Sequence, residues 1–328
     1  MIRSPGRSQM SEQRIVSFLP SATEIACALG LEDQLVGITH ECDYPASVTA
    51  KPVVVHSAVA VETMTQAEID EAVSARLRQG LSVYLVDEEL LQDLRPDLIL
   101  TQDLCQVCAP SGNEVTQALN ALATKPQVLW LTPKCLREID DNLREVGAAT
   151  GRGNAAETLI ASGRARLEKI SAVTERLASR PRVFCMEWID PVYCSGHWVP
   201  EMVRIAGGID ELSREGTDSV RIAWDEVVKW RPEVLVIMPC GYDLDETLGF
   251  CPALSALPGW SELPAVRNGR VYAVDANSYF ARPGPRVIDG TELLAHLIHP
   301  DLFPWTGAAD AHRSLTGSPL ETLEPSRP

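Results

Sequence analysis

The residues with the clearest chemical potential are thiols and an imidazole in the first third of the chain. Cys105 and Cys108 are separated by two residues, a spacing that allows two sulfur atoms to bind one metal ion. His40 and Cys42 lie in the segment HECDYP and would complete a set of three cysteines and one histidine. Such a set suits zinc or iron. The indication is weak, because zinc modules usually carry two cysteine pairs at short spacing.

The cysteine pair has other interpretations. A redox pair opens a helix directly after a strand, whereas Pro110, Ser111 and Gly112 delay the entry into a helix here. Thiols at strand ends can also line a ligand site or be chemically inert. Alternatively, a thiolate or His40 could bind the metal centre of a bound corrinoid or haem. These alternatives stay open at the level of the sequence.

No pattern typical of an enzyme active site stands out. The chain lacks the G-x-S-x-G turn of serine hydrolases, so Ser195 is not predicted to be a nucleophile. It also lacks the glycine-rich loops that bind nucleotide phosphates. Asp140 and Asp141 lie in a predicted helix and are typical of a solvated face. We therefore expect a binding protein rather than an enzyme.

Aromatic side chains make up only 5% of the chain, and they gather in segments that directly follow short apolar runs. Such runs are typical of buried strands, and in a parallel sheet the loops after the strands form the ligand site. Flat apolar walls with a few polar groups suit a large organic ligand. These segments hold Trp188, Tyr193, Trp198, Tyr242, Tyr279, Phe280, Cys42, Cys105, Cys108, Cys194 and Cys240. We expect all of these except Tyr242 and Cys194 to contact the ligand, together with His40.

Apolar runs alternate with helical patterns along most of the chain, which predicts mainly parallel sheets covered by helices. The segment from Asn154 to Arg180 has no proline and one glycine, and it predicts one long helix. Because the alternation restarts beyond it, we expect an α/β fold of two Rossmann-like lobes joined by this helix. The expected parts are a disordered N-terminus (1–13), an N-terminal lobe (14–150), the connecting helix (151–180), a C-terminal lobe (181–306) and a disordered tail (307–328).

A sequence pattern that occurs twice in the chain supports two related lobes. The segments DEELLQDLRPDLIL, from Asp87, and WDEVVKWRPEVLVI, from Trp224, each predict a short helix, an Arg-Pro-acid junction and an apolar strand. Pro96 lies seven residues after Glu89, and Pro232 lies seven residues after Asp225. Reuse of a common turn is the simpler alternative, since such junctions recur in α/β proteins.

Several motifs resemble the class III solute-binding proteins of ABC importers, which carry cobalamin, iron-siderophores or haem. The segments RIVSFLPSATEIACALG and LVGITHECDYP are similar to the first lobe of that family, and RVFCMEWIDPVYCSG and NSYFARPGPR to the second. The cobalamin-binding members are the most similar. The resemblance covers roughly residues 14–300 and implies a ligand clamped between two lobes.

The resemblance also implies roles for individual residues. Glu89 and Asp225 hold the places of the acids that dock this family to arginines of the membrane subunits, with Glu226 as a near alternative to Asp225; plain solvated helix acids are the other interpretation. Arg282 matches the cleft arginine of the cobalamin binders, and Tyr279 matches a ring position beside it.

The chain departs from the family pattern where Glu41 and Glu187 replace aromatic rings, and a segment around Thr65–Gln79 looks inserted. The ligand contacts expected from the matched segments are Pro20, Ser21, Glu41, Glu187 and Arg282.

The charge balance limits the choice of partners. With 29 basic and 45 acidic residues, the net charge of −16 repels nucleic acids and anionic membranes. The first thirteen residues lack the apolar core of a secretory signal, and no stretch reaches the length of a membrane helix. We expect a monomer that is cytoplasmic as written, or periplasmic if a leader has been removed.

The expected function is binding of a large cofactor-like ligand, and cobalamin or a related corrinoid is the first candidate. The protein would act as an importer component or as a cytoplasmic carrier or sensor. A haem or iron-siderophore binder and a metal-dependent enzyme are the alternatives.

Overall fold

The first lobe is built on a six-stranded sheet in the order β4-β3-β2-β1-β5-β6. The computed structural model describes residues 13–61, 64–102, 118–120 and 122–315. All neighbouring strands of this sheet are parallel except β4, which runs antiparallel to β3 at one edge. The strands are β1 (Ile15–Ser17), β2 (Leu35–Thr39), β3 (Val53–Ser57), β4 (Tyr84–Val86), β5 (Leu98–Thr101) and β6 (Gln127–Trp130), and the helices are α1 (Pro20–Ala28), α2 (Gln66–Arg78), α3 (Glu88–Leu94) and α5 (Leu136–Ala149).

The second lobe repeats this plan with a five-stranded sheet in the order β11-β10-β9-β7-β8. Its three central strands are parallel, and the two edge strands β8 and β11 are antiparallel. The strands are β7 (Val183–Trp188), β8 (Tyr193–Cys194), β9 (Val234–Ile237), β10 (Val271–Val274) and β11 (His312–Ser314), and the helices are α7 (Val199–Ile205), α8 (Trp224–Trp230), α9 (Leu244–Phe250), α10 (Pro264–Arg267), α11 (Ala276–Tyr279) and α12 (Val287–Ile298).

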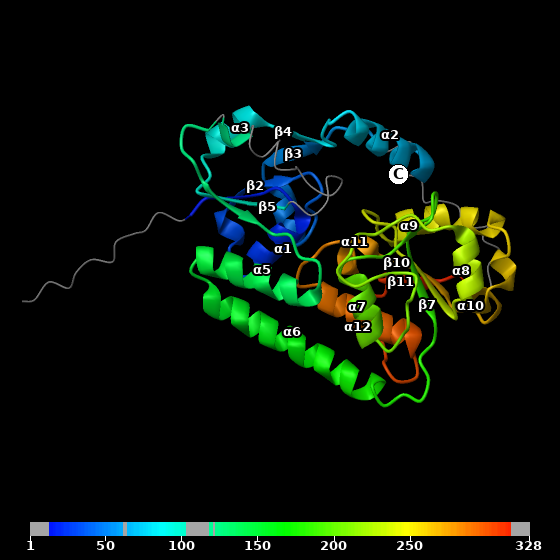
Figure 1. Ribbon diagram of the computed structural model, residues 1–328. Coiled ribbons are helices and arrows are strands. Elements are labelled where there is room, and N and C mark those ends of the chain that lie inside the picture. The colour runs from blue at the N-terminus through cyan, green and yellow to red at the C-terminus, as the bar shows by residue number, and fades with distance from the viewer. Residues whose placement is uncertain (1–12, 62–63, 103–117, 121, 316–328) are drawn as a thin grey trace, which may run out of the picture.

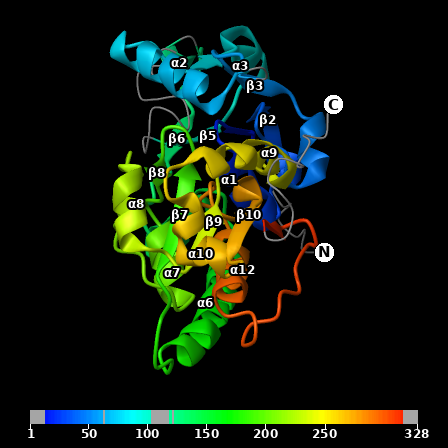
Figure 2. The same cartoon turned by 90° about the vertical axis from the view of Figure 1, so that its right-hand side faces the viewer.

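The long helix α6 (Gly153–Thr174) joins the lobes and runs beneath both of them, as Figures 1 and 2 show. Its 22 residues span roughly 33 Å at 1.5 Å per residue. Ile160 packs in the core of the first lobe and Ile170 in the core of the second. The predicted α/β fold of two lobes joined by a long helix is therefore confirmed, while the boundaries at residues 150 and 180 stay predictions. None of the described helices is both long and apolar enough to cross a membrane.

Close packing explains the single glycine inside α6. A Cβ atom added at Gly163 would lie 3.1 Å from a side-chain carbon of Ile288 on α12. The absence of a side chain therefore lets α12 approach α6 closely. The helix continues through this glycine without interruption.

The beginning of the predicted disordered tail is ordered in the structure, so that prediction was wrong up to residue 315. Strand β11 pairs with β10 and covers its free edge. The Trp305 ring packs against Tyr279, and its indole nitrogen donates to the carbonyl of Ala308 at 2.8 Å. The sequence pattern missed this strand because its three residues, HRS, are polar. The remaining tail residues and the N-terminal residues 1–12 lie outside the described part of the chain.

The sequence pattern that starts at Asp87 and again at Trp224 corresponds to a repeated junction in the structure. Helices α3 and α8 both have seven residues, and each ends at an arginine in the left-handed region, Arg95 (φ 44°) or Arg231 (φ 55°). An arginine before the first strand of each lobe donates to this junction. The Arg14 side chain donates to Leu94 O, and the Arg182 side chain donates to Arg231 O. The two lobes thus share one construction for the connection of a helix to a central strand.

Candidate ligand-binding site

A cluster of ion pairs around the buried Glu24 and Arg282 joins the two lobes, next to Glu41. Arg282, on the loop before α12, donates to both Glu24 (3.4 Å) and Asp43 (2.9 Å) of the first lobe. Arg286 holds the same Glu24 carboxylate through contacts of 2.6 and 2.9 Å. The Glu24 side chain is only 3% exposed and the Arg282 side chain only 8%. We call Glu24, Asp43, Arg282 and Arg286 the basal ion-pair cluster. It gives Arg282, which the resemblance assigned to the ligand, a clear structural partner in the other lobe.

Helix α2 forms a second connection between the lobes. The Gln66 side-chain oxygen accepts from the backbone N–H groups of Ile189 (2.9 Å) and Asp190 (3.4 Å). The Gln66 carbonyl accepts from the indole N–H of Trp188 at 3.3 Å. One turn further on, Asp70 accepts from the Tyr193 hydroxyl at 3.2 Å and forms an ion pair with Arg221. We call this set the α2 contact. In Figure 1, α2 extends from the first lobe to a position above the second.

A capping box fixes the start of α2. Thr65 Oγ1 accepts from the Glu68 N–H at 3.3 Å, and Glu68 accepts from the Thr65 N–H at 2.8 Å. Gln66 is the first helical residue, so the cap places it against the second lobe. The segment that looked inserted in the sequence therefore contributes directly to the contact between lobes.

His40 and Glu41 stand at the carboxyl end of β2, at the edge where ligands bind in such sheets. His40 is exposed, and its Nδ1 lies 3.1 Å from the carbonyl oxygen of Val55. Because a carbonyl only accepts, this bond places a proton on Nδ1, and in the neutral imidazole Nε2 then keeps its lone pair. Burial raises the pKa of the Glu41 carboxyl, while the nearby charges of His40 and Arg282 oppose that rise. The edge of the first lobe thus offers a free imidazole nitrogen beside a carboxyl group.

Aromatic rings mark the facing edge of the second lobe. The Trp188 ring lies 5.7 Å from that of Tyr242, which meets Phe250 edge-on at 4.9 Å. Cys240 follows β9 here, and its N–H donates to the carbonyl of Glu187 at 3.2 Å. Tyr242 and Phe250 were not among the predicted contacts, although the position of Tyr242 after a strand was a signal that could have found it. We call Trp188, Tyr242 and Phe250 the aromatic wall.

The Glu187 carboxyl group at this edge has a strongly raised pKa. Burial raises its pKa from 4.5 to about 7, and hydrogen bonds from Ser219 and the backbone of Gly196 oppose the rise. The Ser219 hydroxyl donates to Oε2 at 2.5 Å. Behind it, burial raises the pKa of Asp210 from 3.8 to about 6. Two carboxyl groups of the second lobe therefore titrate close to neutral pH.

Several predicted contacts lie in the interior instead. Trp198 (5% exposed) and Phe280 (2%) pack in the core of the second lobe, where the Trp198 indole donates to Phe280 O at 2.8 Å. The Tyr279 ring packs against Trp305 and shares no ring contact with the aromatic wall. Ser21 is buried, and Pro20 is partly buried at the start of α1. Trp198, Phe280 and Ser21 are therefore interior, whereas Pro20 and Tyr279 are partly buried and stay predicted ligand contacts.

The predicted set of three cysteines and one histidine is not assembled by the described residues. Cys42 is 5% exposed, and its sulfur lies 3.1 Å from the Thr23 hydroxyl inside the first lobe. Burial raises the pKa of this thiol to about 11, which disfavours the thiolate that a metal requires. Cys105 and Cys108 lie outside the described residues. The described part of the chain holds no group of three or more potential ligands arranged for a metal ion.

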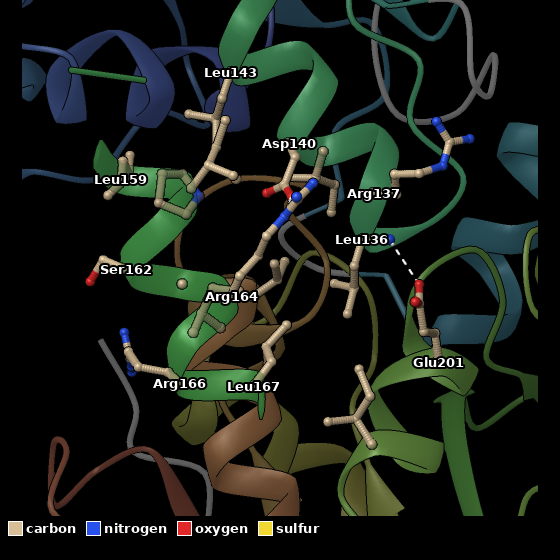
Figure 3. Close-up of a pocket in the computed structure, with 18 residues that line it drawn as sticks. Leu136, Arg137, Asp140, Leu143, Leu159, Ser162, Arg164, Arg166, Leu167 and Glu201 are labelled. Carbon is tan, nitrogen blue, oxygen red and sulfur yellow. Dashed lines mark hydrogen bonds and ion pairs between the residues drawn. The ribbon is translucent and has the colours of Figure 1, made fainter. Parts of the chain in front are cut away.

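The helical side of the lobe interface is closed by α5, α6, α7 and α12. The Leu136 N–H donates to Glu201 across the interface at 2.9 Å, as Figure 3 shows. A mainly apolar cavity of about 310 Å³ lies beside this bond, with Leu143, Leu159 and Leu167 on its wall and Arg164 paired with Asp140. This side faces away from the strand ends that carry the candidate site.

The two predicted docking acids are both exposed. Glu89 lies in the first turn of α3 and Asp225 in the first turn of α8. Because these helices precede the repeated junctions, the two acids hold equivalent positions in the two lobes.

Comparison with known proteins agrees with this architecture. The chain is 28% identical to YvrC, an uncharacterised ABC transporter substrate-binding lipoprotein of Bacillus subtilis, over 89% of this chain and 81% of that protein. It is 24% identical to the vitamin B12-binding protein of Vibrio cholerae, over 85% of this chain and 87% of that protein.

Solved structures show the same fold. The periplasmic vitamin B12 binding protein BtuF of Vibrio cholerae superposes with a TM-score of 0.63 at 23% identity, covering 87% of this chain and 96% of that one. The heme-binding protein RhuT of Roseiflexus sp. RS-1 gives a TM-score of 0.66 at 22% identity, covering 88% and 99%. The profile of the periplasmic binding protein family matches residues 15–278. The chain therefore belongs to the periplasmic binding protein family.

Proposed function

We propose that this solute-binding protein delivers a corrinoid to an ABC importer and binds it between the edge of the first lobe and the aromatic wall of the second. The observation that carries the proposal is the family match over residues 15–278, together with contacts between segments that follow strands of the two lobes, Gln66 with Ile189 and Asp43 with Arg282. The relatives named vitamin B12-binding proteins align with 85% of the chain and favour a corrinoid. Trp188 and Tyr242 supply the flat surface that such a macrocycle needs.

Haem is the second candidate. It is favoured by the exposed His40, whose Nε2 carries a free lone pair suited to an axial position on iron. The similar structures named heme-binding support the same ligand class. Both candidates are flat macrocycles around a metal, so the same walls serve either.

Titration with cyanocobalamin, hydroxocobalamin and hemin tests this proposal directly. Binding of a cobalamin at micromolar or lower concentration, followed by absorbance and calorimetry, is the expected result. Binding of hemin alone would replace the corrinoid by haem as the ligand. Failure of all three would contradict a macrocycle as the ligand.

Replacing Trp188 with alanine is expected to weaken ligand binding by about 1–3 kcal/mol, roughly tenfold to a hundredfold, as for the loss of an aromatic anchor. The matched control is Tyr279→Phe, because this ring packs against Trp305 rather than in the aromatic wall. Isothermal titration of both variants measures the difference. Equal losses in both variants would show that the wall has been misplaced.

Replacing Glu89 or Asp225 with lysine is expected to lower uptake by the importer at least threefold, because each acid is proposed to pair with an arginine of the membrane subunits. Ligand affinity and thermal stability should stay unchanged, since both side chains are exposed. Glu71→Lys on α2 is the control for a reversed surface charge. Uptake of labelled ligand by reconstituted importer vesicles provides the measurement, and unimpaired uptake by both docking variants would contradict these roles.

The importer role also requires the chain to act on the outer side of the membrane, and the similar vitamin B12 binding protein BtuF is named periplasmic. The cytoplasmic carrier or sensor expected from the sequence requires no export. Fractionation of cells that express the natural gene separates the two.

A further inference from the structure

Helix α2 is anchored on the first lobe, where Val73 packs against the core and the Arg76 side chain donates to the carbonyl of Ser82, and it reaches the second lobe through polar contacts. It connects β3 to β4, which pair with each other at the edge of the first sheet. Its hydrogen bonds to the second lobe reach the β7–β8 segment and Arg221. The helix therefore bridges the cleft at the side where the strands end.

The α2 contact is polar and narrow. Within α2 only Gln66 and Ile69 are buried. Two backbone N–H groups fix the Gln66 side-chain oxygen, which leaves its Nε2 buried without a partner among the described residues. On the partner side, the Arg221 side chain is 52% exposed. A contact with little apolar burial and an unsatisfied donor separates at low free-energy cost.

The remaining connections between the lobes are much firmer. In the basal ion-pair cluster, the side chains of Glu24 and Arg282 are 3% and 8% exposed. Helix α6 packs in the cores of both lobes. Separation at α2 therefore requires neither of these connections to break.

The second-lobe groups that form hydrogen bonds with α2 belong to the candidate site. Trp188 is part of the aromatic wall, and its indole N–H is bonded to α2. The Tyr193 hydroxyl, another predicted ligand contact, is bonded to Asp70. A ligand that approaches this part of the wall meets α2 first.

From these observations we propose that α2 is a lid on the ligand cleft, latched to the second lobe by Gln66 and Asp70, which opens while the two lobes stay together. The ligand part of this proposal rests on the proposed function above. Opening exposes the Trp188 N–H and the Tyr193 hydroxyl, and the closed lid covers the bound ligand. The inserted segment thus controls entry and release.

Amide hydrogen exchange of the full chain without ligand tests the opening. The double variant Tyr193→Phe/Arg221→Ala removes both partners of Asp70 without changing any residue of α2. We expect exchange of the α2 amides to become at least tenfold faster, equivalent to about 1.4 kcal/mol, while exchange in α5 and β9 stays as in the wild type. Arg78→Ala, which removes only the solvent-side pair of α2 with Glu71, is the control and should leave α2 exchange unchanged.

Two results of the hydrogen-exchange experiment would contradict the proposal that α2 is a lid. One is α2 exchange that is unaffected by the double variant. The other is exchange that accelerates equally in α2, α5 and β9, because the lobes would then open as a whole.

Stopped-flow absorbance with hydroxocobalamin and with hemin tests the gating. For a probe that binds the wild type, we expect association and dissociation to be at least threefold faster in the double variant, whereas unchanged rates would overturn the lid. If neither probe binds the wild type, the proposed ligand class fails, and the exchange measurement still decides whether α2 opens by itself.

Discussion

Replacing Glu24 with alanine is expected to lower the free energy of unfolding by about 3 kcal/mol, because it leaves buried guanidinium groups without their carboxylate. Glu24 is the shared acceptor of Arg282 and Arg286, and its side chain is 3% exposed. Arg282 keeps Asp43 as a partner, whereas Arg286 loses its only described carboxylate. Urea denaturation followed by circular dichroism measures the loss.

A surface ion pair provides the control for this substitution. Glu157 also accepts two hydrogen bonds from one arginine, Arg144, but its side chain is 60% exposed. Solvent screens such a pair, so Glu157→Ala should leave the urea midpoint nearly unchanged. Similar losses in the two variants would mean that burial of the basal ion-pair cluster is not what makes it stabilising.

Replacing Glu187 with glutamine is expected to stabilise the protein at pH 8 relative to the wild type, with the advantage about 2 kcal/mol larger at pH 8 than at pH 5. The folded state raises the pKa of Glu187 from 4.5 to about 7 through burial. A raised carboxyl pKa means that the folded state holds its proton more tightly than the unfolded state. The associated stability is complete below about pH 4.5 and is lost as the pH rises through about 7. Glutamine stays neutral and keeps an oxygen for the Ser219 hydroxyl.

Urea denaturation of wild type and variant between pH 4 and pH 9 measures this difference. Asp210→Asn is the matched comparison, because burial raises the pKa of Asp210 only to about 6. The pH range over which this substitution changes the free energy of unfolding must therefore lie lower. Parallel stability curves for wild type and Glu187→Gln would show that Glu187 is already charged in the folded protein at neutral pH.

Local signals in the sequence were sufficient for the fold. The central strands, such as β2 and β10, are short apolar runs, because strands buried on both faces read as continuous apolar segments. The capping box of Thr65 and Glu68 fixed the start of α2 for the same local reason. The long helix was recognisable because proline is absent from it and apolar residues recur along it.

The site depends on contacts that sequence patterns do not encode. Arg282 meets Glu24 across 258 positions of the chain, and Trp188 meets Gln66 across 122. A position after a strand also does not decide whether an aromatic ring faces the cleft or the core. Trp198 and Phe280 follow strands yet are buried, whereas Trp188 and Tyr242 form a wall. Sequence spacing therefore located the edges of the sheets but not the orientation of individual side chains.

The repeated junctions at Arg95 and Arg231 have a consequence for assembly. They place Glu89 and Asp225 at equivalent points of two similar lobes, so each lobe offers one acid at the start of a matched helix. A membrane assembly made of two identical subunits could then receive this monomer in either of two orientations related by a half-turn. Only the differences between the halves, such as one extra methylene in Glu89 and the helix α2 present in one lobe alone, would make the two complexes unequal.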